Sequence, residues 1–144
     1  MTKFAVETKG YAPPLQAWID WILEGHGRDG LAVQLSPEVV FHSPVVFTPQ
    51  RGPEITMAYL MAAQVALGGA DGRFSYTAIF DAGHGAMLEF ETEIDGKYVN
   101  GVDIIKWDAA GKIVDFKVMV RPLQAVQAVH ASMGQMLEQM KKRA

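Results

Sequence analysis

The spacing of apolar residues changes once along the chain, from a repeat of three to four residues to strict alternation. The first repeat follows Pro13, a residue type suited to the first turn of a helix. Its apolar members lie about one helical turn apart: Leu15, Trp18, Ile19 and Ile22. This pattern predicts an amphipathic helix, ending near Gly25, whose apolar face carries a large aromatic side chain.

Two further helices and one short strand are predicted before the pattern changes. Residues 29–35 form a short helix that ends at Ser36-Pro37, because the residue before proline avoids the helical region. Residues 39–44 are rich in β-branched and aromatic residues and predict a strand. Pro53 begins a third helix. The inner face of this helix is expected to comprise Ile55, Tyr59, Ala62 and Ala66.

Alternation dominates from residue 73 onward and predicts four long strands. They span residues 73–81, 86–94, 97–107 and 112–121. Glycine-bearing turns separate them, and Asp95-Gly96 is the strongest hairpin signal among these turns. Consecutive hairpins produce an antiparallel meander, and strands of about ten residues tend to bend and curl into a half-barrel.

A last helix is predicted over about residues 122–143. One face of it is expected to be a continuous buried seam, formed by Leu123, Val126, His130, Met133, Leu137 and Met140. No repeat, low-complexity tract or linker interrupts the order of elements. Residues 1–144 are therefore predicted to form a single α+β domain.

Composition narrows the classes of function. A formal net charge of −3 offers no basic face for a phosphate backbone, which argues against a nucleic-acid partner. The absence of cysteine excludes disulfides, thiolate nucleophiles and cysteine-ligated metals, and the four histidines lack metal-binding spacing, so we predict no metal. No stretch approaches the roughly 20 apolar residues of a membrane span, and no signal-like segment is present, which predicts no membrane partner and a cytoplasmic location.

Two segments carry a resemblance to a known superfamily. They are residues 35–44 (LSPEVVFHSP) and residues 102–114 (VDIIKWDAAGKIV). With the order of elements over residues 13–121, they resemble the nuclear transport factor 2-like superfamily, which includes ketosteroid isomerases and SnoaL-like polyketide cyclases. The resemblance implies a cone-shaped, curved antiparallel (mixed) sheet wrapped around helices and enclosing an apolar pocket. Because this superfamily serves many activities, the fold by itself selects none of them.

Strand pleating indicates which side chains would face such a pocket. Along residues 97–107, one face is apolar except for Asp103, and Gly101 on that face is expected to leave room for a ligand. The predicted ligand is a small, largely apolar carbonyl-type molecule, and the predicted chemistry on it needs no cofactor. The residues expected to contact it are Trp18, Ile22, Phe41, Tyr59, Met87, Phe90, Gly101, Ile105, Trp107, Phe116 and Val118.

Asp103 is the first candidate catalytic residue. The resemblance places it where ketosteroid isomerases hold the protonated aspartic acid of an oxyanion hole, and an apolar wall would raise its pKa in the same way. The structural alternative is a carboxyl group anchored to a polar side chain of a neighbouring strand, with Tyr59 as one candidate for a hydroxyl network. The resemblance also aligns Ser43 with the general-base Asp of those isomerases, and Ile19 with their helix-borne Tyr. This departure argues against steroid isomerisation by the family's mechanism.

His42 is the candidate replacement base, because imidazole titrates near neutral pH. It precedes Ser43 on the predicted short strand. Strict alternation would point His42 away from the pocket if Ser43 points inward, whereas a bulge at Ser43-Pro44 would reverse this. The structural alternative is a histidine at the sheet edge that is hydrogen-bonded to the backbone.

Two hypotheses of function follow. In the first, the chain is a cofactor-independent isomerase, cyclase, lyase or hydrolase of the ketosteroid isomerase-like type. Asp103 binds the ligand's oxygen in it, and His42, or a water it orients, moves a proton. In the second, it is a non-catalytic ligand-binding or dimerisation module. In both, apolar residues such as Val102, Ile104 and Met119 on the outer face of the sheet predict a homodimer.

Overall fold

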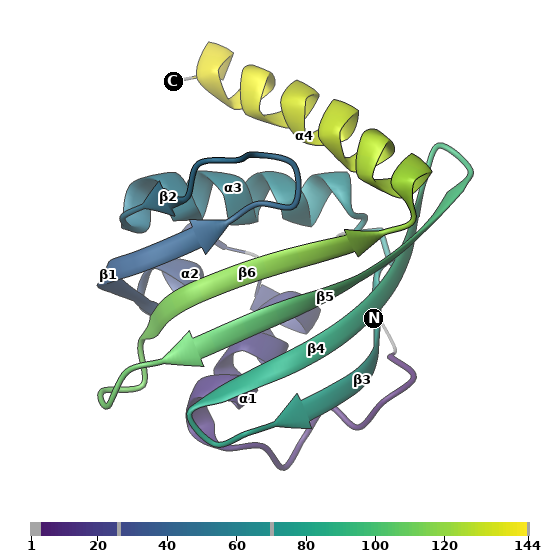
Figure 1. Cartoon of the computed structure of the whole chain (residues 1–144). Coiled ribbons are helices and arrows are strands. Elements are labelled where there is room, and N and C mark those ends of the chain that lie inside the picture. The colour runs from purple at the N-terminus through teal and green to yellow at the C-terminus, as the bar shows by residue number, and fades with distance from the viewer. Residues whose placement is uncertain (1–3, 26, 70, 144) are drawn as a thin grey trace.

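The chain folds into one curved mixed sheet with helices packed against one face and across one end. The computed structural model describes residues 4–25, 27–69 and 71–143. In Figure 1, α1, α2 and α3 lie behind the sheet, and α4 crosses its end. The elements in order are α1 (Pro13–Asp20), a π-helical turn η1 (Trp21–Gly25), α2 (Arg28–Ala32), β1 (Leu35–His42), β2 (Gln50–Arg51), α3 (Pro53–Ala66), β3 (Ser75–Asp81), β4 (Gly85–Ile94), β5 (Lys97–Trp107), β6 (Ile113–Arg121) and α4 (Leu123–Arg143). The predicted α+β class is confirmed.

The sheet has six strands in the order β2-β1-β6-β5-β4-β3. The pairs β3–β4, β4–β5, β5–β6 and β1–β2 are antiparallel, whereas β1 runs parallel to β6. The predicted hairpin at Asp95-Gly96 joins β4 to β5, and both turn residues have positive φ angles of 50° and 77°. A two-residue turn of this kind matches the twist of the flanking strands, so the register between β4 and β5 continues without a shift.

The pleating of β5 places the face that carries Asp103 toward the helices. The buried residues of this strand alternate with half-buried or exposed ones, and they are Val99, Gly101, Asp103, Ile105 and Trp107. This is the set that strict alternation predicts. The core beneath them is strongly aromatic: the rings of Trp18 and Phe116 are 4.9 Å apart between centroids, in an edge-to-face arrangement.

Two predictions of local structure were wrong at the start of the chain. The second helix is shorter than residues 29–35, and β1 begins at Leu35, so Pro37 lies inside a strand instead of before one. The pairing of β1 with β6 shifts between Leu35 and Val40, and such an irregularity accommodates a proline that cannot donate a ladder hydrogen bond. In α3, Ile55 is 40% exposed, and the buried face instead includes Thr56 and Leu60.

Helix α4 is rotated relative to the predicted seam. His130 is exposed and Leu123 is 67% exposed, while Ala125 and Val129 are buried. Of the predicted seam, Met133 is buried, and Leu137 and Met140 pack against the core. The small Ala125 side chain is fully covered because α4 packs against both α3 and the strands β4 to β6. None of the described helices is long and apolar enough to span a bilayer.

Gly101 does not leave room for a ligand, contrary to the prediction. A Cβ atom built on it would lie 2.3 Å from Phe90 Cζ and 2.7 Å from the Met119 carbonyl oxygen. The space above Gly101 is therefore filled by the ring of Phe90, which is fully buried. Gly101 is needed for the close packing of β4, β5 and β6.

Substituting Gly101 with alanine should therefore destabilise the protein. Overpacking of this kind typically costs about 1–3 kcal/mol. Urea unfolding monitored by tryptophan fluorescence would measure the change. The matched control is Gly134→Ala in α4, where a Cβ would meet no atom within 4 Å; it should leave stability unchanged or raise it by up to about 1 kcal/mol. Equal stability of the two variants would contradict the packing role of Gly101.

Candidate functional site

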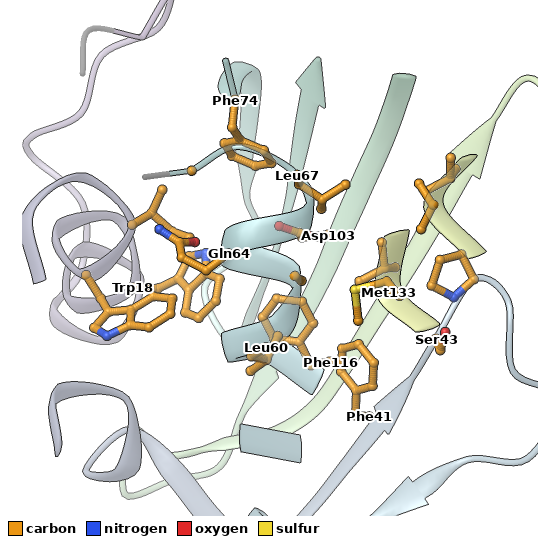
Figure 2. Close-up of a pocket in the computed structure, with 18 residues that line it drawn as sticks. Trp18, Phe41, Ser43, Leu60, Gln64, Leu67, Phe74, Asp103, Phe116 and Met133 are labelled. Atoms are coloured by element: carbon orange, nitrogen blue, oxygen red, sulfur yellow. The ribbon is translucent and has the colours of Figure 1, made fainter. Parts of the chain in front are cut away.

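A small, mostly apolar cavity lies between the sheet and the helices. Its free volume is about 50 Å³, and its walls come from α1 and η1, α3, α4 and the strands β1, β5 and β6. Figure 2 shows the side chains that converge on it. Among the 18 residues that line it, three non-aromatic side chains are polar: Ser43, Gln64 and Asp103. Asp103 is the single titratable residue in this set.

Some of the residues predicted to contact a ligand line this cavity. They are Trp18, Ile22, Phe41, Phe116 and Val118. They come from three separate parts of the chain, and the sheet and the first helix bring them together. The cavity wall also includes residues that the sequence analysis did not select, chiefly Gln64, Phe74, Val129 and Met133.

The other predicted contacts lie elsewhere. Met87 is 46% exposed, because it alternates with the buried Leu88 and thus faces outward. The ring of Phe90 packs on Gly101 and does not line the cavity. Tyr59 lies against Phe41, at a ring-centroid distance of 5.3 Å, and does not line the cavity either. Two residues on the inner face of β5, Ile105 and Trp107, are buried in the core outside the cavity lining.

His42 faces away from the cavity. Its Nε2 lies 3.1 Å from Asp115 Oδ2 on the neighbouring strand β6, and its side chain is 30% exposed. Phe41 and Ser43, on either side of it, both line the cavity. The chain therefore keeps strict alternation here, and no bulge turns His42 inward. The structure therefore does not bring His42 to this cavity, where the sequence analysis expected a base.

Asp103 is connected to a buried chain of hydrogen bonds. The Tyr76 hydroxyl group donates to Asp103 Oδ2 at 2.5 Å, and Trp18 Nε1 donates to the Tyr76 oxygen at 3.0 Å. Tyr76 is fully buried, and Asp103 is 7% exposed. No other hydrogen bond within the described part of the chain reaches the Asp103 side chain, so its Oδ1 atom is left for a partner in the cavity.

The surroundings of Asp103 alter its acidity. Burial raises the pKa of Asp103 from 3.8 to about 7, and the hydrogen bond from Tyr76 partly opposes this rise. Burial, followed by the charge of Asp103, holds the pKa of Tyr76 well above 10.0. Tyr76 is therefore a hydrogen-bond donor at neutral pH, and Asp103 exists there in both its neutral and its ionised form.

The sequence analysis missed Tyr76 and considered Tyr59 in its place. Tyr76 pairs with Phe90 on β4, which pairs with Gly101 on β5. The Tyr76 hydroxyl group reaches across β4 to Asp103, which lies two residues beyond Gly101 on the same face of β5. This contact depends on the register of three strands. A polar aromatic residue at an inward position of β3 was the available signal.

Replacing Tyr76 with phenylalanine should raise the pKa of Asp103 further, because it removes the hydrogen bond that favours the ionised form. It also leaves the Trp18 N–H group without its acceptor, which should destabilise the protein by about 1–3 kcal/mol. A ¹³C NMR titration of the Asp103 carboxyl carbon in both proteins would measure the shift. A pKa that stays the same or falls would show that Tyr76 does not stabilise the ionised carboxylate.

The described residues contain no cluster of three or more histidine or acidic side chains that could hold a metal ion, and His26 lies outside them. The polar groups of the cavity, one carboxyl, one amide and one hydroxyl, suit hydrogen bonding to an uncharged ligand with a few oxygen atoms.

Comparisons with known proteins place this fold in a family. No family model matches the chain, and no curated protein matches it. Among solved structures, a steroid delta-isomerase from Pseudomonas aeruginosa is 31% identical, with 90% of this chain and 92% of that chain covered and a TM-score of 0.81. A nuclear transport factor 2-like protein of unknown function from Mesorhizobium loti is 20% identical, with 76% and 91% covered and a TM-score of 0.62.

A third structure, from Shewanella putrefaciens, is of a protein assigned as a SnoaL-like polyketide cyclase. It is 13% identical, with 87% of this chain and 88% of that chain covered and a TM-score of 0.59. The two more distant structures support the fold alone. The identity and coverage of the first, together with the mixed curved sheet and its order of elements, define the class. The chain belongs to the nuclear transport factor 2-like superfamily.

Proposed function

We propose that the cavity binds a small, largely apolar carbonyl compound, and that Asp103 moves a proton on it in an isomerisation or cyclisation. The observation that carries this proposal is the Oδ1 atom of Asp103, which has no protein partner among the described residues and belongs to a mostly apolar wall. A carboxyl group with a pKa of about 7 is well matched to general acid–base catalysis at neutral pH. The similarity to a steroid delta-isomerase structure supports the same class of chemistry.

Asp103 acts as both base and acid in this proposal. Ionised Asp103 takes a proton from the carbon next to the carbonyl group; the C–H bonding electrons form a C=C bond, and the oxygen becomes an enolate. The new O–H group on Asp103 then returns a proton to the same carbon or to a conjugated one; in D₂O this hydrogen is exchanged for deuterium before it is returned. Because no other titratable side chain among the described residues lines the cavity, Asp103 performs both steps in this proposal.

Ligand binding requires the cavity walls to move. Its free volume of about 50 Å³ is far below the roughly 300–1,000 Å³ of typical ligand pockets. Met133 of α4 lies on the wall, and an unbranched methionine side chain adapts readily to different shapes. We expect α4 and its methionine to shift outward when a ligand enters.

Proton exchange into 2-tetralone tests this function, because this bicyclic ketone is apolar and has acidic hydrogens at C1. In D₂O at neutral pH, the protein should accelerate loss of the C1 signal in ¹H NMR, with saturation at high ketone concentration. Saturable binding without any acceleration would support the alternative of a non-catalytic binding module. Absence of both binding and exchange would contradict the proposal.

We also propose that two copies of the chain associate through the outer face of the sheet. Phe80, Met87 and Met119 are 62%, 46% and 51% exposed on this face. They line an open hollow together with Glu89 and Arg121. Opposite charges on one patch can pair with each other across a two-fold axis, which favours a second copy as the partner.

Sedimentation velocity at micromolar concentration should therefore show a dimer. Substituting Met119 with glutamate places a charge in the centre of this face and should produce a monomer with the same unfolding temperature at low protein concentration. A wild-type protein that sediments as a monomer would contradict self-association through this surface.

A further inference from the structure

Gln64 is a buried polar residue whose side-chain N–H groups have no hydrogen-bond acceptor in the described structure. It lies on α3, is 9% exposed, and lines the cavity together with Asp103. Its Nε2 atom is buried and has no hydrogen-bond partner among the described residues. In Figure 2 the side chain extends from α3 toward the side of the cavity where Trp18 lies. Since unpaired buried amides are rare and costly, this one requires an explanation.

The chain provides a defined place for this amide. A Cβ atom built on Gly69 would lie 2.6 Å from Gln64 Nε2 and 2.7 Å from its Cδ, so the amide group rests directly on the backbone of Gly69. Gly69 also lines the cavity. The absence of a side chain at this one position is what makes room for the amide.

The proposed reaction needs a hydrogen-bond donor that Asp103 cannot supply. While Asp103 is ionised and acts as the base, it carries no proton to donate to the ligand's oxygen. The indole N–H groups on the wall already donate elsewhere, that of Trp18 to Tyr76 and that of Trp21 to the Gly27 carbonyl oxygen. Ser43, which accepts a bond from the backbone N–H of Val45, lies on the other side of Asp103 from Gln64 in Figure 2.

We infer that the Gln64 side-chain amide donates a hydrogen bond to the carbonyl oxygen of the ligand and stabilises the enolate oxygen as it forms. This inference rests on the proposed function, and it gives Gln64 and Asp103 separate roles. The hydrogen bond strengthens when negative charge develops on the oxygen, which is the condition for stabilising a transition state. The amide binds uncharged ketones at any pH, because it does not titrate.

A pair of ligands separates binding of the oxygen from binding of the apolar rings. 2-Tetralone and tetralin have the same bicyclic skeleton, and only the first has a carbonyl group. Calorimetric titration at pH 8 should show that the wild-type protein prefers the ketone about tenfold, the usual worth of one buried hydrogen bond. Gln64→Leu should bind both ligands equally, and its exchange rate should fall about a hundredfold, as for loss of an oxyanion donor.

Thr56→Val is the matched control. Thr56 also lies on α3, is fully buried, and has an Oγ1 atom without a partner in the described structure, but it is not on the cavity wall. This variant should keep the tenfold preference. Both variants should unfold at or above the wild-type temperature, because each removes an unpaired buried polar group. Gly69→Ala, which displaces the amide but retains Gln64, should reproduce the loss of preference.

The outcomes separate this inference from the function on which it rests. If Gln64→Leu and Gly69→Ala retain the preference for the ketone, Gln64 is not the donor and the inference is overturned. If Ser43→Ala loses the preference instead, Ser43 is the hydrogen-bond donor, and the inference is overturned as well. A wild-type protein that binds neither ligand, or whose exchange activity does not depend on Asp103, would overturn the proposed function itself.

Discussion

Replacing Asp103 with asparagine should lower the protein-catalysed exchange of deuterium into C1 of 2-tetralone about a hundredfold or more, which is the typical contribution of general acid–base catalysis. The amide is close in size and shape to the carboxyl group, and its oxygen can still accept the hydrogen bond that Tyr76 donates to Oδ2. It cannot take a proton from carbon. The loss should therefore appear in the rate constant at saturating ketone, measured by ¹H NMR, and only weakly in ketone affinity.

The control for this prediction is Asp115→Asn. Asp115 is the carboxylate that lies 3.1 Å from His42, outside the cavity lining, and the pair is partly exposed. Its removal should leave exchange unchanged. Asp103 is the one titratable side chain that the described residues place on the cavity wall. If Asp103→Asn exchanged deuterium as fast as the wild-type protein, the catalytic proposal would therefore fail.

Asp103 should also make the stability of the protein depend on pH in a specific direction. In the unfolded chain its carboxyl group ionises near 3.8, whereas in the fold it stays neutral until about pH 7. Between these values the folded state binds one more proton than the unfolded state, so the free energy of unfolding falls as pH rises. The contribution is fully present below the lower pKa and is lost when pH passes the higher one.

The expected size of this effect is on the order of 4 kcal/mol between pH 4 and pH 7. Urea unfolding of the wild-type protein and of Asp103→Asn across this range would measure it, because the difference between the two cancels all other titrations. Wild-type stability should fall relative to the variant up to about pH 7 and then run parallel to it. A difference that stays constant with pH would mean that Asp103 titrates normally in the folded protein.

The sequence by itself determined the class of fold and the direction of the Asp103 side chain. Both depend on local rules: alternation along residues 97–107 separates inward from outward side chains, and the Asp95-Gly96 turn sets the register of β4 and β5. For His42, alternation left two directions open, depending on whether a bulge was present. Only the structure could show that no bulge intervenes at Ser43-Pro44.

Tertiary structure alone decided what surrounds Asp103. The contact with Tyr76 needs the combined register of β3, β4 and β5, and the space over Gly101 depends on the ring that an adjacent strand places there. The face that α4 buries depends on the rotation of this helix against α3 and the sheet. The sequence of α4 has apolar residues on adjacent faces, so its helical repeat does not specify which face is buried. Periodicity within one segment reports which side of that segment is buried, whereas contacts between segments depend on packing that no single segment encodes.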